Sequence, residues 1–479
     1  MKRIVNAYAV LALFAVISLP AQTFTTLHTF DGTDGANPWA GLVQATNGSL
    51  YGTTSAGGAN SQGTAFKIAP SGALTTLYSF CSQSGCTDGA DPVAGLVQAT
   101  NEDFYGTTLY GGANNAGTIF KITPGGALTT LYSFCSQSNC ADGSTPYAGL
   151  VQTANGYLYG TTFSGGANGN YGTVFRITPS GTLATIYSFC PQTGCVDGEG
   201  PVAGLVQAAS GDLYGTTEEG GANAGGTIFQ INPASGTLTT LYAFCSQTDC
   251  ADGVGPEGGL IQAANGDLLG TAGGGTEGEG VVFSITPTGT LTRLHSFCYH
   301  CGEGTGPRAG LVRATDGDLY GTTVSGGARR SYGTAFKITP SGALTTIYSF
   351  CSQSGCIDGS GPYAPLVQAT NGSFYGTTAE GGADSACANG CGTIFSLSVG
   401  LGPFVETQTT SGEVGVAVKI LGSDLAGATS VTFNGTAATF TVVSSYLITA
   451  TVPAGATSGR VEVVTPSGTL SSNMAFRVP

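Results

Sequence analysis

Four short runs of residues between Gly95 and Phe134 decide the fold of this chain. They are Gly95-Leu-Val-Gln-Ala99, Phe104-Tyr-Gly-Thr-Thr108, Gly117-Thr-Ile-Phe-Lys-Ile122 and Leu128-Thr-Thr-Leu-Tyr-Ser-Phe134. The runs are rich in aromatic and β-branched residues, and Gly, Asn, Asp, Pro and Ser separate them. This pattern predicts four consecutive β-strands joined by turns and loops.

The four-strand unit is repeated seven times. Its Tyr-Gly-Thr-Thr core recurs at Tyr51, Tyr105, Tyr159, Tyr214, Tyr320 and Tyr375, and Leu269 replaces the Tyr in the fifth copy. Successive copies are 54, 54, 55, 55, 51 and 55 residues apart. Four short strands per repeat at this period are typical of a β-propeller with four-stranded blades. We therefore expect an all-β protein with a seven-bladed β-propeller.

The two ends of the repeat array complete each other. The seventh copy ends with the predicted strand at 393–397 and has no fourth strand after it. The missing strand is found near the N-terminus, where Phe24-Thr-Thr-Leu-His-Thr-Phe30 aligns with residues 74–80. We expect this N-terminal strand to complete blade seven and close the ring. The alternative is an open β-solenoid, which would need caps at its ends.

A second module follows the repeats after Leu401-Gly402. Runs at 414–422, 430–435, 448–453 and 459–464 alternate as short sandwich strands do. About 80 residues without Cys fit an immunoglobulin-like β-sandwich. The predicted domains are therefore a propeller at residues 22–400 and a sandwich at residues 401–479.

The composition agrees with this architecture. Charged residues make up 9% of the chain against roughly 25% in an ordinary globular domain, and Gly supplies 79 residues. Blades packed on both faces need small or apolar residues, and their turns need glycine. The net charge of −14 argues against a nucleic-acid partner, which would require a basic surface.

The N-terminus has the layout of a secretory signal peptide. Lys2 and Arg3 precede an apolar run from Ala7 to Leu19, and we expect cleavage between Ala21 and Gln22. Residues 1–21 are thus predicted to be removed. The run from Ala7 to Leu19 is too short to favour a membrane-spanning helix, and no other run approaches 18 apolar residues. No membrane span is therefore expected in the mature chain. The predicted location is secreted or at the cell surface, with the periplasm as an alternative.

The 14 cysteines form seven pairs of close neighbours. An even number of locally paired Cys in an exported chain predicts disulfides. Zinc is the alternative at the one C-x-x-C pair, but structural zinc needs four ligands. The predicted disulfides join Cys81 with Cys86, Cys135 with Cys140, Cys190 with Cys195, Cys245 with Cys250, Cys298 with Cys301, Cys351 with Cys356 and Cys387 with Cys391.

Two family resemblances follow from these motifs. Asp88-Gly-Ala-Asp-Pro92 together with the first three runs quoted above resembles the GloVer tandem repeat of exported bacterial "choice-of-anchor" proteins, over residues 24–399. Val431-Thr-Phe-Asn-Gly435, Ala450-Thr-Val-Pro453 and Phe476-Arg-Val478 resemble an IPT/TIG domain. We expect no sorting tail after Pro479. The resemblance implies a β fold in an extracellular or cell-surface setting and assigns no catalytic residues.

One acidic residue per blade stands in the loop before the first strand, close to a recurrent Pro. One interpretation is a ring of carboxylates at the channel mouth, which would bind Ca²⁺ or a cationic or polyhydroxyl ligand. The other is that each acid caps its own turn by accepting hydrogen bonds from N–H groups two residues on. Repetition in every blade favours capping, so we expect no cofactor. If the carboxylates do form a ring, Ca²⁺ is the candidate ligand. The acids are Asp34, Asp88, Asp142, Asp197, Asp252, Glu303 and Asp358, with Asp91 nearby.

The residue after the recurrent Pro differs between copies. Ring closure makes Trp39 of blade one and Tyr363 of blade seven neighbours. Trp39, Tyr147 and Tyr363 are candidates to stack on sugar rings, with Glu257 and Arg308 as polar partners. The favoured alternative is that these side chains pack at the rim against Pro and the disulfides. Val93 and Val202 fill the remaining two positions.

These features predict a non-enzymatic extracellular or cell-surface binding module whose ligand is a glycan or a protein. The alternative is a glycosidase or lyase that uses carboxylates at the channel mouth. Paired acids such as Glu218 with Glu219 or Glu277 with Glu279 could also serve such an enzyme, but acids in Gly-rich loops are usually solvated. A third hypothesis is a purely structural envelope protein. His28 and His295 replace a Tyr of the fourth strand and are interpreted as structural. The sequence singles out no catalytic residue.

Overall fold

The computed structural model describes residues 22–328, 331–384 and 386–479, and within them it contains strands and short 3-10 turns but no α-helix. Nine four-stranded sheets are present in the described residues, seven in the repeats and two in the C-terminal part. The predicted all-β class is confirmed. The predicted signal peptide lies outside the described residues. None of the described residues forms a helix long and apolar enough to cross a membrane.

Each of the first six repeats forms one antiparallel sheet in which the strands follow their sequence order. The predicted first strand is shorter than expected and pairs over two residues only. The strands of repeats one to three are β2 (Val43–Gln44), β3 (Leu50–Thr54), β4 (Thr64–Ile68), β5 (Leu74–Ser79), β6 (Val97–Gln98), β7 (Phe104–Thr108), β8 (Thr118–Ile122), β9 (Leu128–Ser133), β10 (Val151–Gln152), β11 (Leu158–Thr162), β12 (Thr173–Ile177) and β13 (Leu183–Ser188).

Repeats four to seven have the same layout, except that repeat seven has three strands of its own. Their strands are β14 (Val206–Gln207), β15 (Leu213–Thr217), β16 (Thr227–Ile231), β17 (Leu238–Ala243), β18 (Ile261–Gln262), β19 (Leu268–Ala272), β20 (Val281–Ile285), β21 (Leu291–Ser296), β22 (Val312–Arg313), β23 (Leu319–Thr323), β24 (Thr334–Ile338), β25 (Leu344–Ser349), β26 (Val367–Gln368), β27 (Phe374–Thr378) and β28 (Thr393–Ser398).

The Tyr-Gly-Thr-Thr motif forms the second strand of each sheet, and packing explains its residues. Every residue of β7 is buried. A Cβ on Gly106 would lie 2.7 Å from the ring of Phe120, so glycine makes room for that ring. Thr107 Oγ1 donates a 3.0 Å hydrogen bond to the carbonyl of Ala148 in the next repeat. The motif therefore builds the sheet and joins it to its neighbour.

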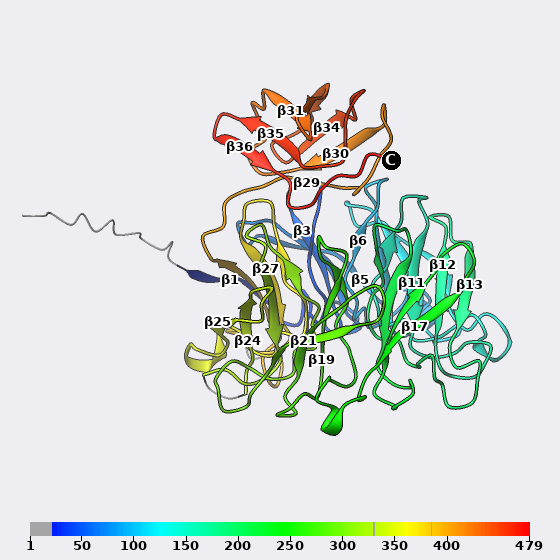
Figure 1. Ribbon diagram of the computed structural model, residues 1–479. Helices are drawn as coiled ribbons and strands as arrows, with labels where there is room; N and C mark the ends of the chain where they lie inside the picture. The colour runs from blue at the N-terminus through cyan, green and yellow to red at the C-terminus, as the bar shows by residue number, and fades with distance from the viewer. Residues whose placement is uncertain (1–21, 329–330, 385) are drawn as a thin grey trace, which may run out of the picture.

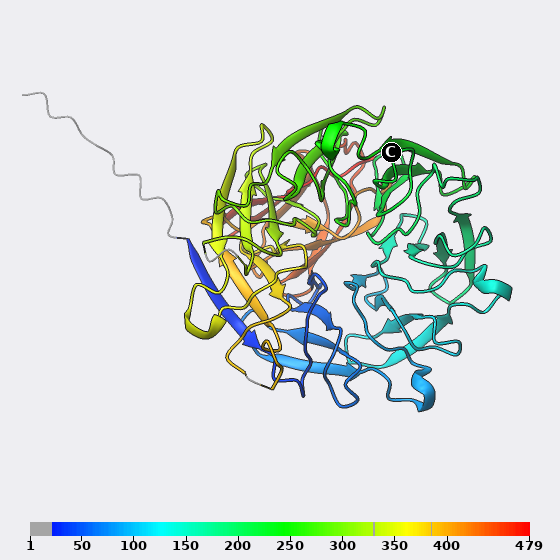
Figure 2. The same cartoon turned by 90° about the horizontal axis from the view of Figure 1, so that it is seen from below.

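The N-terminal strand β1 (Thr23–Thr29) completes the sheet of repeat seven by pairing with β28. Repeat seven contacts repeat one as consecutive repeats contact each other. Thr377 Oγ1 donates to the carbonyl of Ala40 at 3.2 Å, which repeats the Thr107 contact. Viewed from below, the repeat sheets follow one another around a common axis, and β1 lies beside the last of them (Figure 2). The N-terminal strand thus joins the two ends of the array.

The C-terminal part has two sheets around one apolar core, which includes Val418, Phe433 and Phe476. One sheet has the order β29-β30-β34-β33 and the other β32-β31-β35-β36. Their bounds are β29 (Glu406–Thr407), β30 (Ala417–Leu421), β31 (Ser430–Phe433), β32 (Thr436–Ala437), β33 (Phe440–Val442), β34 (Leu447–Thr451), β35 (Val461–Thr465) and β36 (Gly468–Ser471).

This C-terminal module covers one face of the repeat sheets (Figure 1). Its contacts reach the tight turns between the first and second strands of the repeats. Lys419 Nζ lies 2.6 Å from Glu102 Oε1, and the amide of Phe404 donates to the carbonyl of Thr370 at 2.9 Å. We call this the turn face. The longer connections, which carry the cysteines, leave the opposite ends of the strands and form the loop face.

Candidate functional site

The disulfides staple the loop face. The structure joins all seven predicted cysteine pairs, and the described residues contain no free cysteine. Four of the stapled loops contain a single 3-10 turn: η1 (Ser84–Cys86), η2 (Ser138–Cys140), η3 (Thr248–Cys250) and η4 (Ser354–Cys356). The other three pairs close their loops without such a turn, and these are Cys190 with Cys195, Cys298 with Cys301, and Cys387 with Cys391. The cross-links restrict the loops, and rigid loops are suitable supports for a binding site.

The recurrent acids hold these stapled loops. Asp88 is fully buried and accepts hydrogen bonds from the Tyr78 hydroxyl at 2.7 Å and from the N–H groups of Ser82 at 2.8 Å and Gln83 at 3.1 Å. Burial alone would raise the pKa of Asp88, but these hydrogen bonds outweigh burial and the pKa is lowered. The donors precede the acid, whereas we expected N–H groups two residues after it. Asp142, Asp252 and Asp358 have the same arrangement.

The three remaining acids follow the same principle with different donors. Asp197 accepts from the Tyr187 hydroxyl at 2.9 Å. Where His replaces the Tyr, His28 Nε2 lies 2.7 Å from Asp34 Oδ2. His295 Nε2 lies 3.2 Å from Glu303 Oε2, but the hydrogen bond to Glu303 comes from the amide of Cys298 at 3.0 Å. Each acid is thus engaged within its own loop, and the structure does not bring the seven together. In the described part of the chain, no group of three or more His, Cys, Asp or Glu side chains is arranged to hold a metal ion.

The positions after the recurrent Pro do meet across repeats. The rings of Trp39 and Tyr363 stack with centroids 5.0 Å apart and 6° between their planes. Trp39 remains 43% exposed. The side-chain amide of Asn37, two residues before Trp39, donates to the carbonyl of Ala379 at 2.9 Å and fixes the first loop against repeat seven. We call the Trp39–Tyr363 pair the aromatic platform.

The other predicted binding residues lie on the same face. Glu257 Oε2 is 3.1 Å from Arg308 Nη1, which links the loops of repeats five and six. Tyr147 is 38% exposed and makes an edge contact with Phe163. Burial raises the pKa of Tyr147, and the charges of Asp91, Glu218 and Glu257 add to this effect. These carboxylates from three other loops therefore lie close enough to Tyr147 to affect it.

One exposed residue of this region, Tyr110, was not selected from the sequence and is 46% exposed. Glu218, which the sequence offered only as one acid of a pair, has a raised pKa because of burial first and then the nearby charge of Glu257. Burial also raises the pKa of Glu257, although Arg308 opposes the shift. The available signal is that the copies also differ just after Thr-Thr, where Tyr110 and Glu218 stand.

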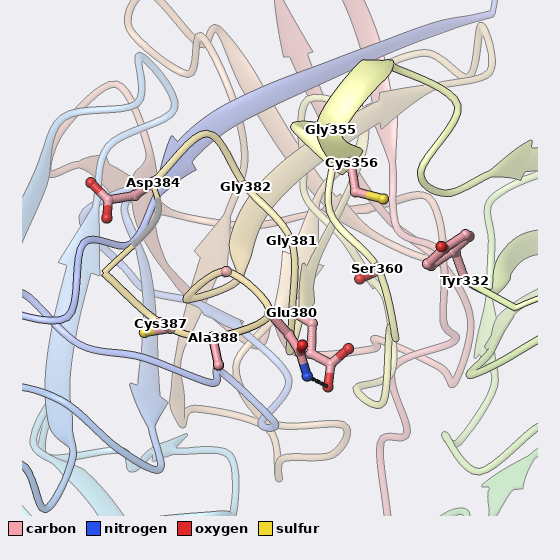
Figure 3. Close-up of a pocket in the computed structure, with 12 residues that line it drawn as sticks. Tyr332, Gly355, Cys356, Ser360, Glu380, Gly381, Gly382, Asp384, Cys387 and Ala388 are labelled. Atoms are coloured by element: carbon pink, nitrogen blue, oxygen red, sulfur yellow. Dashed lines mark hydrogen bonds between the residues drawn. The ribbon is translucent and has the colours of Figure 1, made fainter.

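A cavity of about 500 Å³ opens in the loop face at repeat seven, and Figure 3 shows its lining residues. It lies beneath the connection between Thr378 and Thr393, which is longer than the equivalent connection in repeat two, from Thr108 to Thr118. The cavity was not predicted, although the longer connection marks repeat seven in the sequence. Side chains of Tyr332, Ser360, Glu380, Asp384 and Asn389 line it, together with glycine backbone and the Cys387 loop.

The chain was compared with protein families, curated proteins and solved structures. The Gloeobacter/Verrucomicrobia repeat family matches residues 13–150, 136–310 and 299–424, and the IPT/TIG domain matches residues 403–478. No curated protein matches the chain.

Among solved structures, a fungal alcohol oxidase of the AA5 family in complex with copper is 13% identical, with a TM-score of 0.52 over 95% of this chain and 98% of that chain. A PQQ-bound aldose sugar dehydrogenase from Streptomyces coelicolor is 14% identical (TM-score 0.39; 79% and 98% covered). TolB from Acinetobacter baumannii is 14% identical (TM-score 0.33; 60% and 61% covered). At these identities the likeness to the oxidase concerns the fold alone. The family matches span most of the sequence, and the chain belongs to the Gloeobacter/Verrucomicrobia repeat family and carries a C-terminal IPT/TIG domain.

Proposed function

We propose that this chain is a non-enzymatic binding module of the cell exterior whose loop face binds a glycan. In this proposal residues 22–400 form a closed seven-bladed β-propeller, and residues 401–479 form an immunoglobulin-like sandwich on its turn face. The contacts between Thr377 and Ala40 support closure of the ring. The seven disulfides support export to an oxidising compartment, since cytosolic thiols are kept reduced.

The aromatic platform is the observation that carries the glycan proposal. Large aromatic side chains are usually buried, and a stacked pair that stays open to solvent is typical of a binding surface. Trp39 is 43% exposed although it stacks on Tyr363. The apolar C–H face of a sugar packs on such rings, while its hydroxyl groups bond to polar groups around them. Glu257 and Arg308 offer such groups on the same face.

The platform is held in place before any ligand arrives. Asn37 donates to Ala379 through its side chain, and its amide donates to the carbonyl of Cys391 at 2.9 Å. The Cys387–Cys391 disulfide restrains that second partner. A preorganised surface loses little conformational entropy on binding, so weak stacking contacts are sufficient for useful affinity.

The same site supports a second candidate, a carbohydrate-active enzyme. A carboxyl group of raised pKa beside a second carboxylate is the arrangement that glycoside hydrolysis uses. Glu218 has such a raised pKa, to which the charge of Glu257 contributes. Against this, Glu257 is ion-paired with Arg308, which makes it less available as the second carboxylate that such a reaction needs as base or nucleophile.

The test uses the mature chain, residues 22–479, on a glycan array and in a polysaccharide turnover assay. Both are run with added Ca²⁺ and with chelator, because Ca²⁺ is the candidate cofactor. Glycan binding without turnover, lost in Trp39→Ala and retained in Tyr299→Ala, is the expected result. Tyr299 is a fair control because it is 45% exposed and lies in a different stapled loop. Turnover lost in Glu218→Gln would favour the enzyme, and binding of proteins alone would rule out the glycan.

A further inference from the structure

The cavity of repeat seven breaks the symmetry of the loop face. In every repeat a residue of the incoming loop forms a backbone bridge with a residue after the second strand, for example Ser144 with Ser164 and Ser360 with Glu380. In repeat seven the connection after the second strand is longer and is closed by the Cys387–Cys391 disulfide, and its described residues border the cavity (Figure 3). Features that all repeats share are explained by the repeated fold. The longer connection of repeat seven is not shared, so it needs a separate explanation.

The lining of this cavity contains a nearly buried hydroxyl group. Ser360 is only 4% exposed and is one of the lining residues. A hydroxyl group can both donate and accept hydrogen bonds, so one that borders a cavity can bond to a ligand. Asn389 Nδ2 is 3.5 Å from Glu380 Oε1, and both residues line the cavity.

The charge and size of the cavity limit what it can take. Glu380 and Asp384 are among its lining residues. Their negative charges disfavour an anionic ligand, while the hydroxyl groups of a neutral ligand can donate hydrogen bonds to carboxylates. A volume of about 500 Å³ is within the range of small-molecule sites, roughly 300–1,000 Å³. Tyr332 adds an aromatic ring to the wall.

The cavity and the aromatic platform are built in part from the same loops. Ser360 and Tyr363 stand in the same loop, three residues apart. Ala379, whose carbonyl accepts from the Asn37 side chain, directly precedes Glu380. The platform and the cavity are thus neighbouring parts of one surface where repeats one and seven meet.

We infer that this cavity is a subsite for one neutral sugar residue, at the end of a glycan whose adjacent residues stack on Trp39 and Tyr363. This inference rests on the proposed glycan-binding function. Hydroxyl groups of the sugar bond to Ser360, Glu380 and Asn389, and the ring of Tyr332 packs against it.

The experiment measures sugar binding to the mature chain, residues 22–479, by NMR and calorimetry. The probes are glucose, galactose, mannose and N-acetylglucosamine, then oligosaccharides ending in the preferred sugar. Glucuronate is the anionic counterpart of glucose. In one variant residues 381–392 are replaced by the shorter sequence of residues 111–117. Ser360→Ala is the second variant, and Ser144→Ala is its matched control at the equivalent bridge in repeat three.

We expect one neutral monosaccharide to bind, with glucuronate at least about tenfold weaker than glucose. Ser360→Ala should weaken binding about fivefold to tenfold, as expected for the loss of one hydrogen bond, and Ser144→Ala should not. Trp39→Ala should weaken the oligosaccharide and leave the monosaccharide unchanged. If Ser360→Ala and the loop exchange leave all binding intact while Trp39→Ala abolishes it, the subsite is wrong and the platform stands. If no sugar binds, both are wrong.

Discussion

Trp39 and Tyr363 lie face to face, 5.0 Å apart between ring centroids, although they belong to the first and last repeats of the chain. Their contact exists because β1 and β28 pair and bring the two ends of the array together. The strand pairing that joins the two ends of the array therefore also brings together the two residues of the aromatic platform. The C-terminal module covers the turn face (Figure 1), whereas the platform belongs to the loop face, where Trp39 is 43% exposed.

The closing strand is predicted to be essential for stability. Phe24 in β1 stacks on Tyr348 with centroids 3.9 Å apart and also contacts Phe395. Phe24→Ala should lower the free energy of unfolding by about 3 kcal/mol, the usual effect of removing a packed aromatic ring. Thr25→Ala, at an exposed position of the same strand, should change it by less than about 0.5 kcal/mol. Chemical denaturation measures the free energy of unfolding of both variants. If Phe24→Ala loses no more stability than Thr25→Ala, β1 does not close the array.

The Asp88 network predicts a pH-dependent loss of stability. The pKa of Asp88 is lower in the folded chain than its unfolded value of roughly 3.9, so the carboxylate stabilises the fold above that pH. This stabilisation is lost as the pH falls through the folded pKa. Tyr78→Phe removes one donor and should destabilise the fold by about 1 kcal/mol at pH 7, with a smaller difference below pH 3.

The control for this experiment is Tyr299→Phe, an exposed tyrosine outside the network. Its unfolding should match the wild-type chain at every pH. A Tyr78→Phe effect that stays constant from pH 7 to pH 2 would contradict the role of the Asp88 charge.

The repeat architecture could be predicted because each copy carries its own local signals. Glycine at 106, threonine at 107 and the paired cysteines have equivalents with the same contacts in most copies, so one repeat explains most of the others. The neighbourhood of Trp39 and Tyr363 followed from the displaced N-terminal strand. The repeat architecture and the proximity of Trp39 to Tyr363 can both be inferred from the order of the strands alone.

Features that depend on distances between repeats could not be predicted. The coupling of Glu218 to Glu257 joins loops of different repeats, and sequence spacing contains no such distance. The donors to Asp88 precede it because the stapled loop folds back, whereas a simple capping turn would place them after it. The cavity at Ser360 depends on how one longer connection lies over its neighbour.

The contact between the two modules makes a prediction about Gly48. A Cβ at this residue would lie 2.6 Å from the ring of Tyr446 in the C-terminal module. Gly48 has a φ of 81° and Gly156 a φ of 83°, but a Cβ on Gly156 meets no atom within 4 Å. Both alanine variants should therefore lose about 1 kcal/mol to backbone strain. Gly48→Ala alone should also loosen the C-terminal module.

Hydrogen exchange of the β29–β36 region measures this loosening. Faster exchange in Gly48→Ala than in Gly156→Ala is expected. Identical exchange in the two variants would show that Tyr446 does not pack on the repeat sheets.

The most direct test of the account is the fluorescence of Trp39, which is the only tryptophan in the sequence. Its emission reports the aromatic platform alone. Titration of the mature chain with a glycan found on the array should shift this emission saturably, with the same affinity that calorimetry gives. A glycan that binds by calorimetry and leaves the Trp39 emission unchanged would contradict the platform as the binding site.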